Sequence, residues 1–219
     1  QPGADPGGQH PAGGGGLVTN SGAAANLFIS QPNNSFVTYG GAIGGAINLY
    51  KTSVSGANPS NLTLTAPSTY TGSTTIQGGV LILQDSATLA STTYNLNGGR
   101  MQSENRTGSL SGIANRIPTS SVLNMRTGVY LELGRPGQDV FDTVATVNFL
   151  QGYNELRVDA ASSAAASLNV SSLNVTSGSQ VFFNTGFGTL GNAGTNPTIS
   201  FDNFDAGTMT INGVIPWAV

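Results

Sequence analysis

Two short acidic clusters are the first candidates for chemistry in this chain. Asp139 and Asp142 follow closely after Arg135, and Asp202 and Asp205 stand three residues apart. Aspartates on neighbouring coils, together with an arginine, can bind Ca²⁺ or act as acid and base in cleaving a polysaccharide. Neither pair has the ligand number and spacing of a calcium loop, and aspartate is also common in turns. The sequence therefore favours solvated turn residues, with no catalytic residue and no metal site.

Nucleophilic catalysis lacks its usual partners in this sequence. There is no cysteine, and the one histidine, His10, lies in a stretch rich in glycine and proline. A serine nucleophile needs a base held beside it in a folded site, so a Ser-His-Asp triad is not expected. The glycines from Gly40 to Gly45 are not followed by the lysine or the helix that a phosphate-binding loop requires. We therefore expect no enzyme activity and no cofactor.

Tyrosine offers another route to binding. Tyrosines along a rod could stack on the rings of a surface polysaccharide, or they could pack against neighbouring strands. Aromatic ladders in stacked strands are often simple packing, so the packing interpretation is favoured. The six tyrosines are Tyr39, Tyr50, Tyr70, Tyr94, Tyr130 and Tyr153.

The composition excludes several classes of protein. Charged residues make up 8% of the 219 residues, against about 25% in a typical soluble domain. The net charge is −3 and the one lysine is Lys51, so no basic patch is available to neutralise the phosphates of a nucleic acid. No apolar run approaches the roughly 18 residues that a membrane-spanning helix needs.

The elements that would position these residues are short β-strands. The pair Gly78-Gly79 recurs as Gly98-Gly99, and a repeat of about 20 residues predicts a solenoid. Leu81 and Leu83 are two residues apart, which is the period of a strand with one buried face. No stretch has a convincing helical period. The predicted fold class is therefore all-β, a right-handed parallel β-helix.

These residues also carry a family resemblance. The chain resembles the autotransporter-associated β-strand repeat of bacterial surface passenger domains in four segments: Leu62-Thr63-Leu64, Tyr70-Thr71-Gly72, Thr74-Thr75-Ile76 and Gly78-Gly79-Val80-Leu81. The close match runs from Leu62 to Gly99, and weaker echoes lie at Ser179–Asn184 and Asn212–Val219. The resemblance implies an extracellular, cysteine-poor β-helix built for display. It implies no particular activity.

The composition also divides the chain into three parts. Residues 1–16 hold three prolines and seven glycines and are expected to form a flexible tail. Residues 17–60 are expected to form an N-terminal cap or the end of a preceding repeat. Residues 61–219 are expected to form the β-helix, with about eight coils of about 20 residues. A polar loop is expected from Arg100 to Pro118.

One continuous apolar column is expected to fill the interior of the β-helix. In the run after Gly128, leucines alternate with other residues, so Tyr130 and Glu132 are expected to face outward. The predicted members of the column are Leu62, Leu64, Ile76, Leu81, Leu83, Leu96, Leu131 and Leu133.

The C-terminal stretch carries a predicted assembly interface. Gly213 to Val219 is apolar and contains the one tryptophan. The last coil of a solenoid exposes its core and a row of unpaired backbone groups unless something covers it. We expect a contact with another β-coil, in a longer chain or in the next subunit, and a head-to-tail assembly. The contacting residues would be Val214, Ile215, Trp217 and Val219.

Together these features predict a non-enzymatic structural or adhesive β-helix unit of a secreted or cell-surface bacterial protein or fibre. The expected partners are copies or neighbouring repeats of the same protein, and a surface polysaccharide. Two alternatives stay open. A β-helical polysaccharide lyase or hydrolase would need Asp139, Asp142 and Arg135 to converge in a groove. A phage tail-spike fragment would form a trimer.

Overall fold

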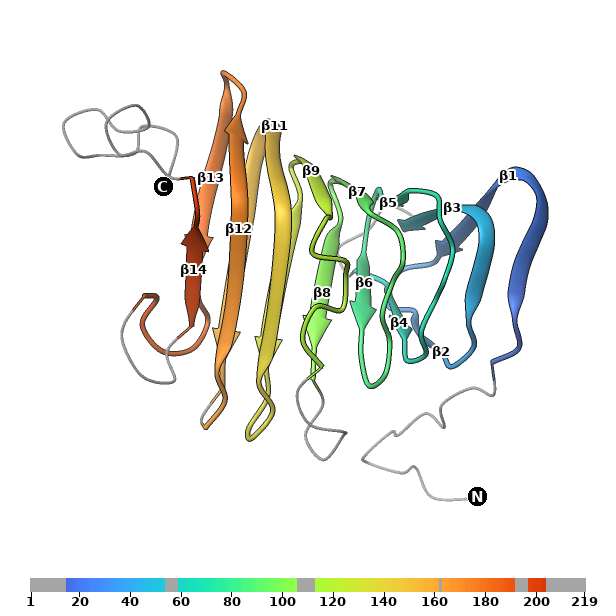
Figure 1. Cartoon of the computed structure of the whole chain (residues 1–219), viewed down its shortest axis with the longest axis horizontal. Coiled ribbons are helices and arrows are strands. Elements are labelled where there is room, and N and C mark those ends of the chain that lie inside the picture. The colour runs from blue at the N-terminus through green and yellow to red at the C-terminus, as the bar shows by residue number, and fades with distance from the viewer. Residues whose placement is uncertain (1–14, 54–58, 106–112, 162, 192–196, 204–219) are drawn as a thin grey trace.

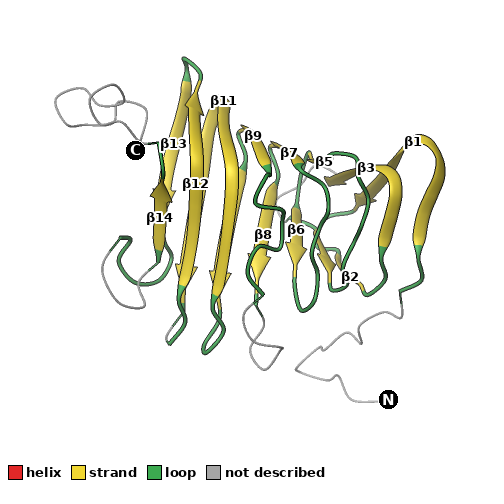
Figure 2. Cartoon of the chain, in the orientation of Figure 1, coloured by secondary structure: helices red, strands yellow, loops and turns green. Residues whose placement is uncertain are grey.

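The computed structural model describes residues 15–53, 59–105, 113–161, 163–191 and 197–203. This part of the chain is all-β, and none of its residues forms a helix (Figure 2). It therefore also holds no helix that is long and apolar enough to cross a membrane. The all-β fold class predicted from the sequence is confirmed.

The strands stack side by side along the long axis of the molecule as a β-solenoid (Figure 1). Every named strand pair is parallel. Sheet A contains β2 (Phe36–Tyr39), β4 (Asn61–Leu64), β6 (Val80–Leu83), β8 (Arg100–Glu104), β10 (Val129–Gly134) and β13 (Ser179–Asn184). Sheet B contains β1 (Val18–Gln31), β3 (Ile43–Ser53), β5 (Thr74–Ile76), β7 (Thr93–Asn97), β9 (Val122–Arg126), β12 (Ala166–Val175) and β14 (Thr198–Phe201).

The long strand β11 (Val140–Ala160) belongs to both sheets. Its first half pairs with β9 and β12 in sheet B, and its last residues pair with β10 and β13 in sheet A. Backbone hydrogen bonds outside the two sheets add a third side to the coils that contain Ser68, Leu89 and Arg116. Ser68 forms a parallel bridge with Leu89, and the Leu89 amide donates to the Arg116 carbonyl at 2.8 Å. Each coil thus winds around one enclosed interior.

The coil length follows the predicted repeat over only part of the chain. In sheet A, Asn61 pairs with Val80 and Val80 with Arg100, and these two coils keep the predicted period. Arg100 then pairs with Val129 and Val129 with Glu155, so the next two coils are clearly longer. The described residues form about six turns, and the expectation of about eight uniform coils is wrong because the later coils take up more of the chain.

The glycine pairs of the repeat form the corner between the two sheets. Gly79 has a φ of 69° and Gly98 a φ of 83°, a backbone conformation that residues with a Cβ rarely adopt. A Cβ on Gly79 would also collide with the Ser60 carbonyl oxygen. The glycines recur because the corner recurs, and this is the local reason for the period of the repeat.

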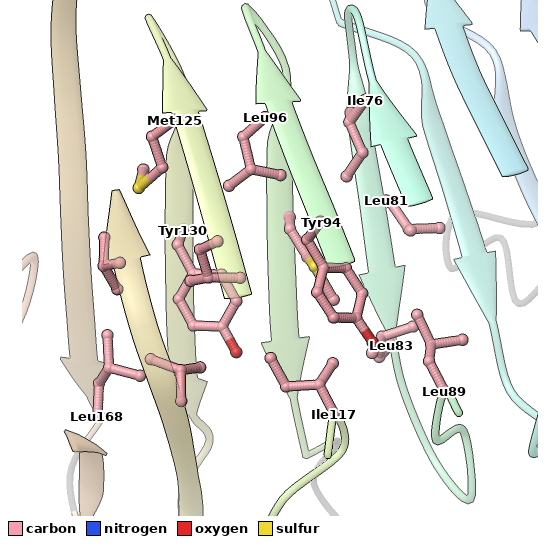
Figure 3. Close-up of a cluster of buried hydrophobic side chains, with 14 of the residues drawn as sticks. Ile76, Leu81, Leu83, Leu89, Tyr94, Leu96, Ile117, Met125, Tyr130 and Leu168 are labelled. Carbon is pink, nitrogen blue, oxygen red and sulfur yellow. The ribbon is translucent and has the colours of Figure 1, made fainter. Parts of the chain in front are cut away.

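The interior column has the predicted apolar character over the first coils. All of the predicted members are buried, and six of the eight belong to the main core: Leu62, Leu64, Ile76, Leu81, Leu83 and Leu96. Leu62, Leu81 and Met101 follow one another in register. Figure 3 shows Ile76, Leu81, Leu83 and Leu96 among the side chains that fill the space between the sheets.

Two local predictions in the middle of the chain are wrong. Arg100–Glu104 is strand β8 and not part of a loop, because Met101 continues the column of Leu81. Tyr130 pairs with Met101, so Tyr130 and Glu132 face the interior. Leu131 and Leu133 lie on the opposite side of β10, where they are nevertheless 4% and 8% exposed. The reversal follows from the register that the long coil sets.

A ladder of asparagines runs along the outer side of sheet B. Asn174, Asn148 and Asn124 each donate a side-chain hydrogen bond to the asparagine of the preceding coil, at 2.9–3.0 Å. The ladder ends where Asn95 donates to the Thr75 hydroxyl at 3.2 Å. Stacked amides of this kind satisfy polar side chains without charge, which fits a chain with few charged residues.

Candidate functional site

The acidic residues that could have formed a catalytic groove have separate partners. Asp139 accepts a hydrogen bond from the Ala165 amide at 2.7 Å. Asp142 is buried in the interior, whereas Arg135 forms an ion pair with Glu104 at 2.8 Å. No hydrogen bond or ion pair joins these three side chains among the described residues. The convergence that a lyase or hydrolase would need is not present there.

Asp142 instead belongs to a layer of polar side chains that crosses the interior of the middle coils. Its Oδ1 accepts from the Arg116 backbone amide at 2.7 Å, and its Oδ2 accepts from the Tyr130 hydroxyl at 3.0 Å. The guanidinium of Arg116 donates to the Ala87 carbonyl and to the side chain of Asn105. Glu132 completes the layer, and Arg116, Tyr130 and Glu132 are all fully buried.

Neither carboxyl oxygen of Glu132 has a hydrogen-bond partner in the part of the chain that the structure describes. Burial, followed by the nearby Asp142 carboxylate, raises the pKa of Glu132 well above its usual range. Burial also raises the pKa of Tyr130, which keeps its hydroxyl protonated as a donor to Asp142. Burial lowers the pKa of Arg116, and Asp142 counteracts that shift. The protonation of each of these side chains therefore depends on the charge of the others.

A buried lysine lies in an earlier coil. Lys51 faces the interior at the corner of the sheets, and its Nζ donates to the Thr52 carbonyl and the Ser60 hydroxyl, both at 2.9 Å. A longer contact of 3.4 Å reaches the Gly78 carbonyl. Desolvation lowers the pKa of Lys51 to about 8. Sequence reasoning missed this burial, although Lys51 continues the alternation of Ile47 and Leu49.

The tyrosines divide between the interior and the surface. Tyr70, Tyr94 and Tyr130 are fully buried, so for these three the packing interpretation is confirmed. Tyr50 is half-buried and stacks on Phe28 with ring centroids 4.8 Å apart. Tyr153 is 47% exposed and stacks on Phe182 at 6.2 Å. The described tyrosines do not form one continuous exposed stripe.

The β1–β2 end of the stack is open in the described part of the chain. β1 pairs with β3 and β2 with β4, and the other backbone edge of each strand has no described partner. Val37 aligns with the core residue Leu62, yet it is 45% exposed because no described coil covers it. The other exposed apolar side chains at this end are Leu17, Val18, Phe28 and Phe36. This end has the chemistry of an incomplete core.

The predicted C-terminal interface cannot be placed in the structure. Val214, Ile215, Trp217 and Val219 lie outside the described residues, as do His10 and Asp205. The interface stays a prediction. At the corresponding end of the described stack, β13 and β14 are the last strands of sheets A and B, and Phe183 packs edge-on against Phe201 at 5.5 Å.

No group of three histidine, cysteine, aspartate or glutamate side chains in the described residues could hold a metal ion. The chemistry that the structure offers is therefore of two kinds: an open, apolar end of a β-stack and a buried polar layer. Comparison of the chain with protein-family models, with curated proteins and with solved structures found no match.

Proposed function

We propose that this chain is a non-enzymatic structural unit of a secreted or cell-surface bacterial protein or fibre, and that it assembles head to tail through the ends of its β-stack. The observation that carries this proposal is the open β1–β2 end, where Val37 sits in the core column but is 45% exposed. An exposed sheet edge bordered by apolar side chains is a template for pairing with another strand.

The parallel arrangement favours a second copy of the chain as the occupant. All coils run in the same sense, so the β13–β14 end of one copy can extend the sheets at the β2–β1 end of the next. This contact joins two different surfaces and does not close, which is the geometry that produces filaments. The net charge of −3 for 219 residues opposes such a contact only weakly.

Localisation and role rest on the sequence. The chain has no cysteine and few charges, and the repeat between Leu62 and Gly99 resembles that of surface-displayed passenger domains. The rival function, cleavage of a polysaccharide, has less support because Asp139, Asp142 and Arg135 have separate partners.

Light scattering of the purified 219-residue chain over a range of concentrations tests the assembly. Val37→Asp places a charge in the open core column and should abolish growth in mass with concentration. Trp217→Asp should have the same effect if the C-terminal stretch supplies the other surface. Phe141→Asp is the matched control, because Phe141 is 38% exposed on the side of the stack and should leave assembly unchanged.

The proposal fails if the unmodified chain stays monomeric at high concentration. It also fails if Val37→Asp assembles like the unmodified chain while keeping its circular dichroism spectrum. If the Val37→Asp and Phe141→Asp variants assemble equally poorly, the cause is loss of folding and not loss of an interface.

A further inference from the structure

The polar layer in the middle coils places two carboxyl groups together inside the solenoid. We propose that Glu132 and Asp142 share a single proton, and that this proton locks the middle coils, holding them closed at low pH and loosening them as the pH rises. The site is distinct from the open β1–β2 end and does not depend on assembly.

The first argument is geometric. Glu132 lies in the interior column of sheet A between Ser103 and Val158, and none of its side chain reaches solvent. Both Asp142 oxygens already accept a hydrogen bond, one from the Arg116 amide and one from the Tyr130 hydroxyl. Glu132 lies on the inward face of β10 two residues after Tyr130, whose hydroxyl donates to Asp142 at 3.0 Å. Asp142 and Tyr130 are therefore close enough to influence the ionisation of Glu132. Two buried carboxyl groups in one layer are stable only if one of them carries a proton.

The second argument is a count of charges. Arg116 is the cation that faces the pair, and one guanidinium neutralises one carboxylate. Its Nη1 and Nη2 are engaged by the Ala87 carbonyl and by Asn105. A second ionised carboxylate would therefore be a buried charge without compensation, which is strongly unfavourable. A proton on Glu132 removes that charge and supplies the missing hydrogen bond to Asp142.

Tyr130 and Arg116 favour ionised Glu132, but burial and the Asp142 carboxylate outweigh them and raise its pKa. β8 places the uncharged Ser103 beside it, and the Ser103 hydroxyl has no hydrogen-bond partner among the described residues. The next coil contributes the apolar Val158. The titratable groups around the pair are Tyr130 on β10, Asp142 on β11, Arg116 between β8 and β9, and Tyr94 on β7, which is coupled to Asp142.

The direction of the pH effect follows from proton counting. Burial raises the pKa of Glu132 in the folded chain above its ordinary value of 4.5. Between these two pKa values the folded chain holds a proton that the unfolded chain has lost. Stability from this group is therefore complete below the ordinary pKa and falls as the pH rises through the window up to the raised pKa. At the steepest point, the unfolding equilibrium constant rises about tenfold per pH unit.

The experiment compares the unmodified chain with Glu132→Gln and Glu155→Gln. Glutamine at 132 can donate to Asp142 at every pH, so it imitates the protonated acid. Glu155 accepts from Asn184 on the other side of sheet A and provides a control with the same change of charge. Denaturant unfolding between about pH 5 and pH 9 should show stability falling for the unmodified chain and for Glu155→Gln. This pH dependence should be absent in Glu132→Gln.

Infrared spectroscopy detects the proton on the carboxyl group directly. A Glu132 side chain that only filled space would not give this signal. The unmodified chain and Glu155→Gln should show the carbonyl band of a protonated carboxylic acid at neutral pH, and Glu132→Gln should lack it. If Glu132→Gln does not fold, Glu132→Leu serves instead, because leucine continues the column of Leu64 and Leu83.

Two results would overturn the proposal. One is the same infrared band, or the same pH dependence of unfolding, with and without Glu132. The other is recovery of alkaline stability on adding sodium or calcium ions to the unmodified chain but not to Glu132→Leu, which would show that a cation and not a proton holds the pair together.

Discussion

The early coils and the middle coils share one interior column, but fill it with different chemistry. In the early coils the column holds Leu64 and Leu83. In the middle coils it holds Ser103 and Glu132, and it becomes apolar again at Val158. Along sheet A the two coils from Asn61 to Arg100 keep the period of the glycine repeat, whereas the coil before them and the middle coils are longer. Regular spacing and an apolar interior therefore occur together.

The difference shows what the extra residues add. Between β8 and β9 the longer coil includes Arg116, whose guanidinium is fully buried. Asp142 on the next coil then binds the Arg116 amide. A short coil leaves room for branched aliphatic side chains, whereas the longer coil brings a charged segment inward, and each charge then requires a partner. The stack is stabilised by apolar packing in one region and by polar pairing in the other.

The largest predicted effect is the loss of the acceptor in the polar layer. Asp142→Ala leaves the Arg116 backbone amide and the Tyr130 hydroxyl buried without their acceptor, and it removes the carboxylate that offsets the buried Arg116 charge. The free energy of unfolding should fall by about 3–5 kcal/mol, measured by denaturant titration. Asp139→Ala, which removes one hydrogen bond from the Ala165 amide of the next coil, should cost only about 1 kcal/mol. Equal losses would mean that the interior layer has no special role.

The apolar region should respond to a cavity. Leu83 is fully buried in the core, so Leu83→Ala should lower the free energy of unfolding by about 2–4 kcal/mol, at all pH values between 5 and 9. Thermal and denaturant unfolding would measure this loss. Leu17→Ala is the control, because Leu17 is 67% exposed. A loss at Leu83 that varied strongly with pH would contradict the contrast between the two regions.

Lys51 is a buried cation in the early coils, so replacing it tests the comparison between the early and the middle coils. Lys51→Met should raise the free energy of unfolding by roughly 1–2 kcal/mol near pH 6, because the cost of burying a cation exceeds its hydrogen bonds. The folded pKa of about 8 lies below the ordinary 10.5, so the unfolded chain binds more protons between these values. The contribution of Lys51 to the stability of the folded chain should therefore become more favourable as the pH rises through this window.

The measurement for Lys51 is the difference in unfolding free energy between the two chains at several pH values. The extra unfolding free energy of Lys51→Met over the unmodified chain should shrink from about pH 7 to about pH 10. An advantage that stayed constant would show that the lysine is equally protonated in both states.

The smallest effect is expected outside the core. Asn148 bonds to the asparagines of the coils on both sides, so Asn148→Ala should cost about 1 kcal/mol. Gln151→Ala changes an exposed side chain of the same strand β11 and should stay within about 0.5 kcal/mol of the unmodified chain. A cost at Asn148 that matched the cost at Leu83 would mean that the outer ladder supports the fold as strongly as the core.

The sequence by itself determined the fold class and the first coils. Leucines two residues apart, with a glycine pair at the corner, predict a buried strand face and a repeat, and both depend on local geometry alone. The core positions from Leu62 to Leu96 were predictable for this reason. Apolar alternation is read directly from neighbouring residues, and Gly79 marks the corner because residues with a Cβ rarely adopt its backbone conformation.

Only the tertiary structure decided which face of β10 points inward. The alternation of β10 fits either choice, since a shift of one residue moves every side chain to the opposite side. The choice depends on the pairing of Val129 with Arg100 in β8, and no local pattern fixes the length of the loop between these strands. Glu132 and Tyr130 therefore entered the core and formed the polar layer with Arg116 and Asp142. Burial of charge is a property of the whole stack, because compensation comes from residues on other coils.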